Sequence, residues 1–535
     1  MRAARWASRD SPRSSGWCSA RATSAHERTA AGALPPSFLR SRQMKIIILG
    51  AGRVGESVAD SLVSEKNDIT VIDTDARRLR DLESRFDLRG VVGSGIDPEV
   101  LAEAGAADTD LLIACAALDE TNLVCCKIAQ LLFNVPTRIA RVSSSGFGTG
   151  DERGRALLGK EGLAVDRIIC PEESLTRYIG KLVQYPEALQ VREFAGGRAC
   201  LASVRARAGA PVVGMRIADM RASAPDVAMR VVAIYRRFPE EPDRFVACDG
   251  TTRIEAGDEV FVLAAREQVP RVLAALHQRG GVPPRPVRRI MIAGGGRVGL
   301  RLARQLAEQG GFHVKILESN ADRCTELASV LPAEVLVLHG DATDEDLLGD
   351  ECIEEVDLFL ALTDDDEDNI MACLLAKRMG ASRVLALINR RSYADLMHGT
   401  QIDIALSPAQ AMLGELLAYV RRGDVQAVHS LRRGVAEALE IVARGDRKSS
   451  RVVGRRVGEI HLPHDVHMGL IVRGLGEHAT ADAGEGMSVP AGEPEVIIPQ
   501  SHTVIESGDH VVFFLPHKRL VREVEKAFRV SATFF

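Results

Sequence analysis

The sequence predicts an α/β protein with two tandem, doubly wound domains, each followed by a small α+β lobe. Its main sign is a long internal repeat. The glycine-rich turn Gly50–Gly55 returns about 244 residues later as Gly294–Gly299, and Asp119–Asn122 returns as Asp366–Asn369. In each copy, short apolar runs rich in β-formers alternate with segments of helical periodicity, which is typical of a parallel sheet covered by helices.

The composition is that of an ordinary folded protein. Of its 535 residues, 46% are hydrophobic and 26% charged, which excludes a largely disordered chain. A net charge of −5 and an aromatic content of 4% argue against a nucleic-acid partner. No apolar run of about 18 residues is present, so we expect no membrane-spanning helix. The ten cysteines form no disulfide-like pattern and are expected to be reduced thiols.

The first copy begins with alternating strands and helices over residues 44–170. Helices are expected to begin at Val54, Asp75, Pro98 and Asp119. The expected strands, all short and apolar, are 45–49, 69–72, 88–92, 110–115 and 137–142.

The domain boundaries follow from changes in pattern. A helical linker at 171–186, opened by Pro171, leads to a small lobe at 187–271 with short alternating strands. Gly280–Pro286 marks the linker between the copies. The second copy repeats the order, with a doubly wound domain at 288–406, a helical linker and a small lobe at 426–535. Residues 474–500, rich in Gly and Pro, are predicted to be a flexible loop insertion without a counterpart in the first copy.

The first 43 residues differ from the rest. They contain eight arginines and only two acidic residues, Asp10 and Glu27. This composition is typical of an organellar transit peptide, but Met44 directly precedes the first strand, so a start assigned too far upstream is an equally simple explanation. We exclude residues 1–43 from the predicted fold, as a disordered extension or a mis-assigned start.

Each glycine-rich turn follows a strand and opens a helix, which is the context of a Rossmann-like dinucleotide site. Gly50 is expected to make the tight turn, Gly52 to let a pyrophosphate approach the backbone, and Gly55 to let the helix pack on the sheet. Asp73, at the end of the second strand, can accept hydrogen bonds from a ribose 2′-hydroxyl and would repel a 2′-phosphate. The site therefore favours NAD(H) over NADP(H). The residues expected in the same roles in the second copy are Gly294, Gly296, Gly299 and Glu318.

The ends of the fourth and fifth strands are expected at the same crevice, where open α/β sheets bind ligands. Arg141, at the end of the fifth strand, is suited to contact phosphate, unless it forms a surface ion pair. The other predicted strand-end residues are Ala116 and Ala117 in the first copy, and Leu362, Thr363, Asn389 and Arg390 in the second. Gly93-Ser94 and Gly340-Asp341 are expected near the adenine.

Two kinds of chemistry lack support. The acidic run 364–368 begins a helix, where carboxylates offset the helix dipole, so we predict no metal ligands there, although a cation site stays open. For a hydride-transfer enzyme, a general acid or base is needed beside the nicotinamide. The Tyr-x-x-x-Lys pair is absent and the first doubly wound domain has no histidine. We predict no catalytic residues, and an NAD-dependent dehydrogenase remains the alternative.

Several segments together resemble the TrkA family, the peripheral nucleotide-binding subunits of bacterial Trk potassium-uptake systems. The resemblance runs from Met44 to the C-terminus and keeps the family's order of two RCK N-terminal (Rossmann) domains, each followed by an RCK C-terminal (TrkA-C) lobe. The segments that carry it are Lys45–Gly52, Asp68–Asp73, Asp119–Asn122, Ile128-Ala129, Arg138–Arg141, Leu375–Ala381 and Ser430–Glu437.

The resemblance implies a cytoplasmic homotetramer on the inner face of the bacterial inner membrane, docked on a TrkH- or TrkG-type potassium-translocating subunit. It implies that NAD(H) and ATP/ADP compete for the N-terminal domains and that the bound nucleotide gates the pore. A regulator of a different cation transporter is the second alternative. The family often has a hydroxyl pair where this chain has Ala116 and Ala117, which could weaken phosphate contact. The cofactor-binding residues that the resemblance implies are Gly50, Ala51, Gly52, Arg53, Val54, Asp73, Ala116, Ala117, Arg141, Gly294, Gly295, Gly296, Arg297, Val298 and Glu318.

Overall fold

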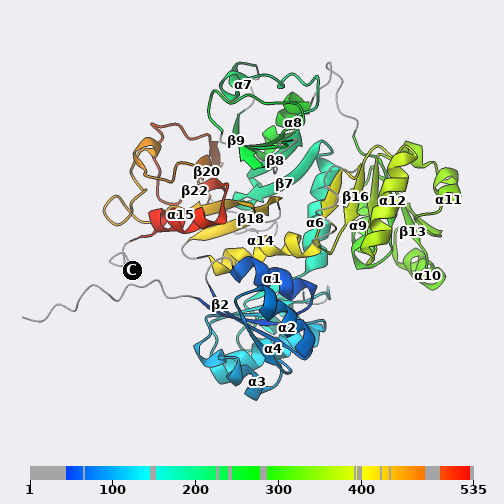
Figure 1. Ribbon diagram of the computed structural model, residues 1–535, viewed down its shortest axis with the longest axis horizontal. Coiled ribbons are helices and arrows are strands. Elements are labelled where there is room, and N and C mark those ends of the chain that lie inside the picture. Colours follow the sequence, from blue (N-terminus) through cyan, green and yellow to red (C-terminus); the bar gives the residue numbers. More distant parts are fainter. Residues whose placement is uncertain are drawn as a thin grey trace, which may run out of the picture. The chain divides into compact units, whose positions relative to one another are not determined.

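The computed structural model shows the two copies as four sheets, two parallel and two antiparallel (Figure 1). The expected extension at residues 1–43 lies outside the described residues, as does most of the expected insertion at 474–500. The structure describes residues 44–63, 67–144, 147, 152–223, 228–238, 244–246, 248–277, 286–390, 393, 401–421, 424–432, 435–475 and 494–530.

The first parallel sheet has six strands in the order β3-β2-β1-β4-β5-β6, which confirms the doubly wound class. Its strands are β1 (Lys45–Leu49), β2 (Asp68–Asp73), β3 (Arg89–Val92), β4 (Leu111–Ala114), β5 (Thr137–Arg141) and β6 (Arg167–Ile169). Its helices are α1 (Arg53–Val63), α2 (Ala76–Arg85), α3 (Pro98–Glu103), α4 (Asp119–Phe133) and α5 (Glu152–Leu158). Because helices cover both faces, the central strands β1 and β4 form nearly continuous apolar runs without alternation.

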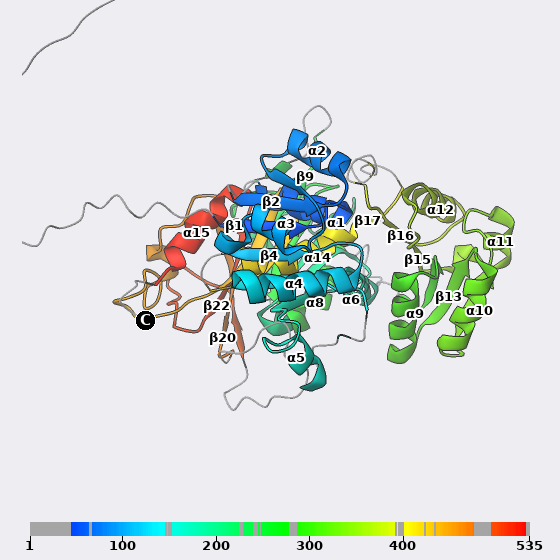
Figure 2. The ribbon, with the colours of Figure 1, turned by 90° about the horizontal axis from the view of Figure 1, so that it is seen from below.

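The second parallel sheet repeats this order as β14-β13-β12-β15-β16-β17. Figure 2 shows α9 and α10 on one side of it and α11 and α12 on the other. The strands are β12 (Arg289–Ala293), β13 (His313–Glu318), β14 (Val335–His339), β15 (Leu358–Ala361), β16 (Val384–Leu387) and β17 (Ile404–Leu406). The helices are α9 (Arg297–Gln309), α10 (Ala321–Val330), α11 (Glu345–Asp350) and α12 (Asp366–Arg378).

The two small lobes are five-stranded antiparallel sheets with matching strand orders, β10-β9-β11-β8-β7 and β21-β20-β22-β19-β18. The first contains β7 (Ala188–Phe194), β8 (Ala199–Arg205), β9 (Met229–Arg236), β10 (Arg244–Val246), β11 (Glu259–Ala265), α7 (Ile217–Ser223) and α8 (Val269–His277). The second contains β18 (Val425–Leu431), β19 (Ala436–Val442), β20 (His467–Arg473), β21 (Glu495–Ile497), β22 (His510–Leu515) and α15 (Val521–Phe528). Short 3-10 turns occur at Ala106–Asp108, Ala195–Gly197, Arg266–Gln268, Ile353–Glu355, Val457–Glu459 and Lys518–Leu520.

One expectation about the second lobe is wrong in part. Glu495–Ile497, which we expected within a loop without counterpart, form β21 and pair with β20. Its counterpart is β10, which pairs with β9 in the first lobe. The abundant glycine and proline around this three-residue edge strand hid it in the sequence.

The linker helices exchange partners between the copies. Helix α6 (Pro171–Gln184), which leaves the first parallel sheet, contributes Leu175 and Ile179 to the core with α9 of the second. Helix α14 (Pro408–Val420) contributes Met412 and Leu416 to the core with α1 of the first. Each N-terminal domain therefore packs against the linker helix of the other copy. No helix of the described ranges is both long and apolar enough to cross a membrane.

Candidate functional site

The first glycine turn has the geometry of a phosphate-binding loop. Gly50 has φ +102°, which L side chains rarely adopt, and its N–H donates to the Ile72 carbonyl at 2.8 Å. A Cβ on Gly55 would lie 1.8 Å from the Gly50 carbonyl oxygen, so only glycine lets α1 start this close to β1. A Cβ on Gly52 would meet nothing within 4 Å, so this glycine leaves room where a ligand would approach.

The second turn repeats this geometry. Gly294 has φ +103° and donates to the Leu317 carbonyl at 2.8 Å. A Cβ on Gly299 would lie 2.1 Å from the Gly294 oxygen, while one on Gly296 would meet nothing within 4 Å. Both turns therefore keep an open position at the third residue, next to the start of a helix, where free N–H groups favour an anion.

The two predicted acidic residues brace the turns. Asp73 accepts the Ala51 N–H at 2.6 Å and the Asp75 N–H at 2.8 Å. Glu318 accepts the Gly295 N–H at 2.8 Å and the Asn320 N–H at 2.9 Å. An ionised carboxylate has about four acceptor positions, so each of these keeps capacity for ribose hydroxyls.

A buried amide fixes the neighbouring strand ends in the first copy. Asn122, fully buried in α4, accepts the Ala116 N–H at 2.8 Å and donates to the Ala116 and Arg141 carbonyls at 3.1 and 2.9 Å. The Ala116 N–H is thus already used within the protein. Ala116 therefore has neither a side-chain hydroxyl nor a free backbone N–H to offer a phosphate. The sequence showed Asn122 only as part of a repeated motif, without its role.

The same device recurs in the second copy, and it aligns the two strands that we expected to carry phosphate-binding residues. Asn369 accepts the Thr363 N–H at 2.9 Å and donates to the Leu387 carbonyl at 2.9 Å. Leu387 is therefore the counterpart of Arg141. The expectation that Asn389 and Arg390 take this place is wrong. They follow the strand end, and both their backbone N–H groups donate to Asp366.

Arg141 itself lies at the cavity. Its Nε is buried and has no hydrogen-bond partner among the described residues. Its Nη2 lies 3.8 Å from Oε1 of Glu172, the second residue of α6. We expected an anion contact or a surface ion pair at Arg141; the structure shows an ion pair that is largely buried and too long for a hydrogen bond.

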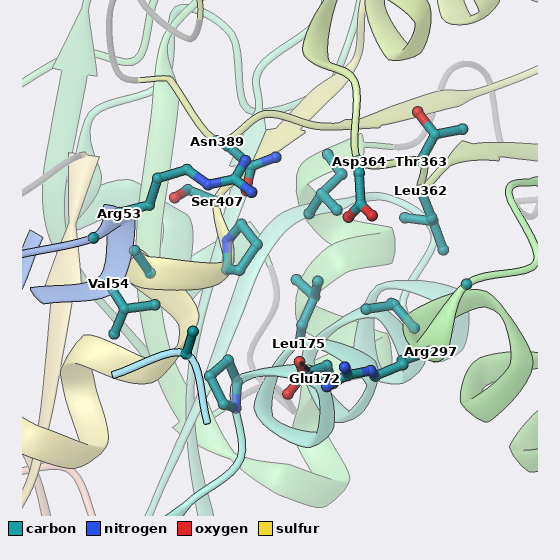
Figure 3. Close-up of a pocket in the computed structure, with 18 of the residues that line it drawn as sticks. Arg53, Val54, Glu172, Leu175, Arg297, Leu362, Thr363, Asp364, Asn389 and Ser407 are labelled. Carbon is teal, nitrogen blue, oxygen red and sulfur yellow. Dashed lines mark ion pairs between the residues drawn. The ribbon is translucent and has the colours of Figure 1, made fainter. Parts of the chain in front are cut away.

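Glu172 was missed by the sequence analysis, because nothing in a helix start at Pro171-Glu172 distinguishes a functional carboxylate from one that offsets the helix dipole. The same Oε1 lies 3.8 Å from Nη1 of Arg297, in the second glycine turn. Figure 3 shows Glu172 beside Arg297 in the cavity, with Arg53 and Asn389 across it.

One cavity of about 870 Å³ joins the two turns. Cys115 lines it beneath Gly50, where burial raises the pKa of its thiol to about 12, so it is a neutral packing group and not a nucleophile. Within the described residues no group of three or more acidic, His or Cys side chains is arranged to hold a metal ion. The predicted site residues that line the cavity are Gly50, Gly52, Arg53, Val54, Asp73, Gly93, Ser94, Ala116, Ala117, Arg141, Gly294, Gly296, Arg297, Val298, Glu318, Gly340, Asp341, Leu362, Thr363 and Asn389.

Comparison with known proteins settles the family. The model of the TrkA-N domain matches residues 46–171 and 290–408, and that of the TrkA-C domain matches residues 201–277. The chain belongs to the TrkA family. A "Trk system potassium uptake protein TrkA" of Halomonas elongata is 47% identical over 492 residues, which cover 92% of this chain and 100% of the relative. A protein of the same name from Vibrio alginolyticus is 45% identical, with the same coverage of both chains.

The fold is shared with a solved channel structure of low sequence identity. The "GsuK channel bound to NAD" matches with a TM-score of 0.54 at 16% identity, covering 92% of this chain and 80% of that one. As a TrkA-family chain, the protein is a component of a potassium-uptake system and not an enzyme, which confirms the prediction of a non-enzymatic role.

Proposed function

We propose that this chain is the nucleotide-sensing subunit that gates a TrkH- or TrkG-type potassium-translocating membrane subunit. The observation that carries the proposal is the single cavity lined by two glycine turns, each braced by a carboxylate. In a transport subunit without catalytic chemistry, such a cavity serves to bind a ligand and not to transform it.

NAD(H) fits the first turn best among the common dinucleotides. The open position at Gly52 admits a pyrophosphate to the start of α1, and Asp73 has acceptor capacity for the adenosine ribose. A 2′-phosphate would meet the Asp73 carboxylate, so NADP(H) should bind more weakly. The NAD bound to the similarly folded GsuK channel supports this choice.

ATP and ADP are the competing ligands in this proposal. Both share the adenosine of NAD(H), so they would use the same turn, and Arg141 offers a cation for their terminal phosphates. Nucleotides can gate the pore only if they bind two shapes of the protein with different affinity. The exchanged helices α6 and α14 give the cavity a mechanical connection to both copies.

We further propose that the chain works as a homotetramer on the inner face of the membrane. Helix α4 supports a contact between copies, because Leu131 and Leu132 are 64% and 61% exposed. At the position of Leu131, the second copy has Arg378, which pairs with Glu345. A Leu131→Asp variant should therefore shift the native mass towards smaller assemblies, and an unchanged mass would remove α4 from the contact.

The experiment for gating combines binding and transport. Calorimetry on the purified chain should show stable binding of NADH and ATP, mutual competition, and weaker binding of NADPH. The chain should co-purify with its potassium-translocating subunit, and potassium flux through the reconstituted complex should differ between NADH and ATP. A chain that binds no adenine nucleotide, or that consumes NADH, would refute the proposal.

A further inference from the structure

Glu172 is a carboxylate shared by arginines of both nucleotide turns. Its Oε1 lies 3.8 Å from Nη2 of Arg141 and 3.8 Å from Nη1 of Arg297. Its side chain is 16% exposed and that of Arg141 is 22% exposed, whereas that of Arg297 is 70% exposed. The carboxylate thus lies equally far from two guanidinium groups and forms a hydrogen bond with neither.

Of the two arginines near Glu172, Arg141 is the one with a buried donor that lacks a partner within the described part of the chain. Its Nε has no hydrogen-bond partner among the described residues although it is buried, and leaving such a group unpaired is unfavourable. A guanidinium binds a phosphate group through two parallel hydrogen bonds, which a carboxylate 3.8 Å away does not supply. A phosphate group within reach would therefore compete well with Glu172 for Arg141.

The second copy lacks both members of the pair. The buried asparagine of each copy donates to a carbonyl at the end of the fifth strand. In the first copy this carbonyl belongs to Arg141 on β5, and in the second it belongs to Leu387 on β16. Pro171 opens α6 and Pro408 opens α14, so the counterpart of Glu172 is Ala409. Leu387 and Ala409 thus stand where the first copy has Arg141 and Glu172. The Arg141–Glu172 pair is therefore a feature of the first site and not of the fold.

We propose that Glu172 selects between nucleotides at the first site and links that site to the second copy. This inference rests on the proposed function. A nucleoside di- or triphosphate presents a terminal phosphate that takes Arg141 from Glu172, and the released carboxylate pairs with Arg297 at the start of α9. NAD(H), whose phosphates are both bridging, leaves Arg141 with Glu172. The two classes of nucleotide thus leave different ion pairs between the copies, which is the differential interaction that gating requires.

The first test is a Glu172→Gln variant, titrated with ATP and with NADH. Loss of the competing carboxylate should raise ATP affinity about fivefold, since a partly exposed ion pair contributes up to about 1 kcal/mol. NADH affinity should change less than about twofold on the same scale. Glu173→Gln is the matched control, because Glu173 is the next residue of α6 and also pairs with an arginine of α9, Arg301, at 3.7 Å.

The link to the second copy is tested with Arg297→Ala. If Arg297 competes with Arg141 for Glu172, its loss should lower ATP affinity, and this fall should vanish in the Glu172→Gln background. A fall that persists there would mean that Arg297 contacts the nucleotide directly, and would overturn the link.

The selection by Glu172 would be overturned if Glu172→Gln left the ratio of ATP to NADH affinity unchanged, if Glu173→Gln raised it equally, or if the gain persisted in an Arg141→Ala background. These outcomes all require that the wild-type chain binds ATP. A wild-type chain that binds neither nucleotide would refute the proposed function itself, and this inference with it.

Discussion

The two glycine turns have the same backbone geometry and differ in the side chain at the end of the neighbouring fifth strand. In both, a glycine with φ near +100° begins the turn, a carboxylate braces the next residue and a buried asparagine fixes the adjacent strand ends. At the end of the fifth strand the first copy has Arg141 and the second has Leu387. Duplication therefore preserved the backbone geometry that makes a turn and changed the side chain at the end of the neighbouring strand.

The charged side chains that line the cavity also differ between the two turns. The first turn has Arg78 nearby and Arg141 at the strand end, whereas Asp341, Asp364 and Asp368 line the cavity beside the second turn. Arg323, the counterpart of Arg78, is turned towards the second glycine loop and donates to the Gly295 carbonyl at 2.9 Å. We infer that the first site is the better one for nucleotides with several phosphates.

The shared backbone geometry can be tested by adding a methyl side chain at one glycine of each turn. Gly55→Ala and Gly299→Ala would each place a Cβ about 2 Å from a backbone oxygen, so the helix must move. We expect each to lower the free energy of unfolding by about 3 kcal/mol, as for overpacked cores. Urea denaturation measures the loss. If only one of the two variants were destabilised, the turns would not be structurally equivalent.

Arg141→Ala sharpens the contrast at the end of the fifth strand. Loss of a charge-assisted contact should weaken ATP binding by about 2 kcal/mol, or roughly thirtyfold. NADH binding should weaken much less. Calorimetry with both ligands gives the comparison, and Leu387→Met is the control at the matched position of the second copy. Equal losses for ATP and NADH would show that Arg141 does not contact terminal phosphates.

Asp73→Ala tests whether the brace of the first turn also binds ribose. We expect NADH affinity to fall by about 1–2 kcal/mol, the scale of a hydrogen bond to a charged group. Because Asp73 also accepts the Ala51 N–H, Asp73→Asn is a useful companion that can keep one acceptor for the turn. Unchanged calorimetric affinity in both variants would place Asp73 outside the nucleotide site.

The sequence was sufficient where a single residue type has one physical use. Gly50 and Gly294 were predictable because their positive φ needs glycine, and the alternation of strands and helices predicted both parallel sheets. It was insufficient where the role of a residue depends on where a strand ends. A shift of a few residues separates a strand end from the loop after it, so the sequence pattern favours Arg390 where the structure has Leu387.

Contacts between distant segments were also beyond reach of the sequence. Glu172 meets Arg297 only because α6 crosses to the second copy, and no local pattern encodes that exchange. Similarly, the repeated Asp119–Asn122 motif was visible, but the bridging role of Asn122 depends on two strand ends that lie beside it only after folding.

The small lobes also differ between the copies, and the effect that we expect there is the smallest. By strand register, His429 on β18 is the counterpart of Arg192 on β7. Burial, and then the nearby Arg192, lower the pKa of His429 to about 3, and its Nε2 contacts the Glu193 carbonyl at 2.9 Å. The other charged group that lowers this pKa is Lys181.

The sign of the resulting pH dependence follows from proton binding. The unfolded chain takes up a proton at His429 near pH 6.5, whereas the folded chain does so only near pH 3, so acid favours unfolding between these values. From pH 7 to 6 the wild type should lose roughly 0.7 kcal/mol of stability through this residue. His429→Gln, which keeps a donor for the Glu193 carbonyl, should lose that much less over the same interval in urea denaturation. An identical loss in both proteins would show that His429 takes up a proton in the folded chain as readily as in the unfolded chain, which would contradict the lowered pKa.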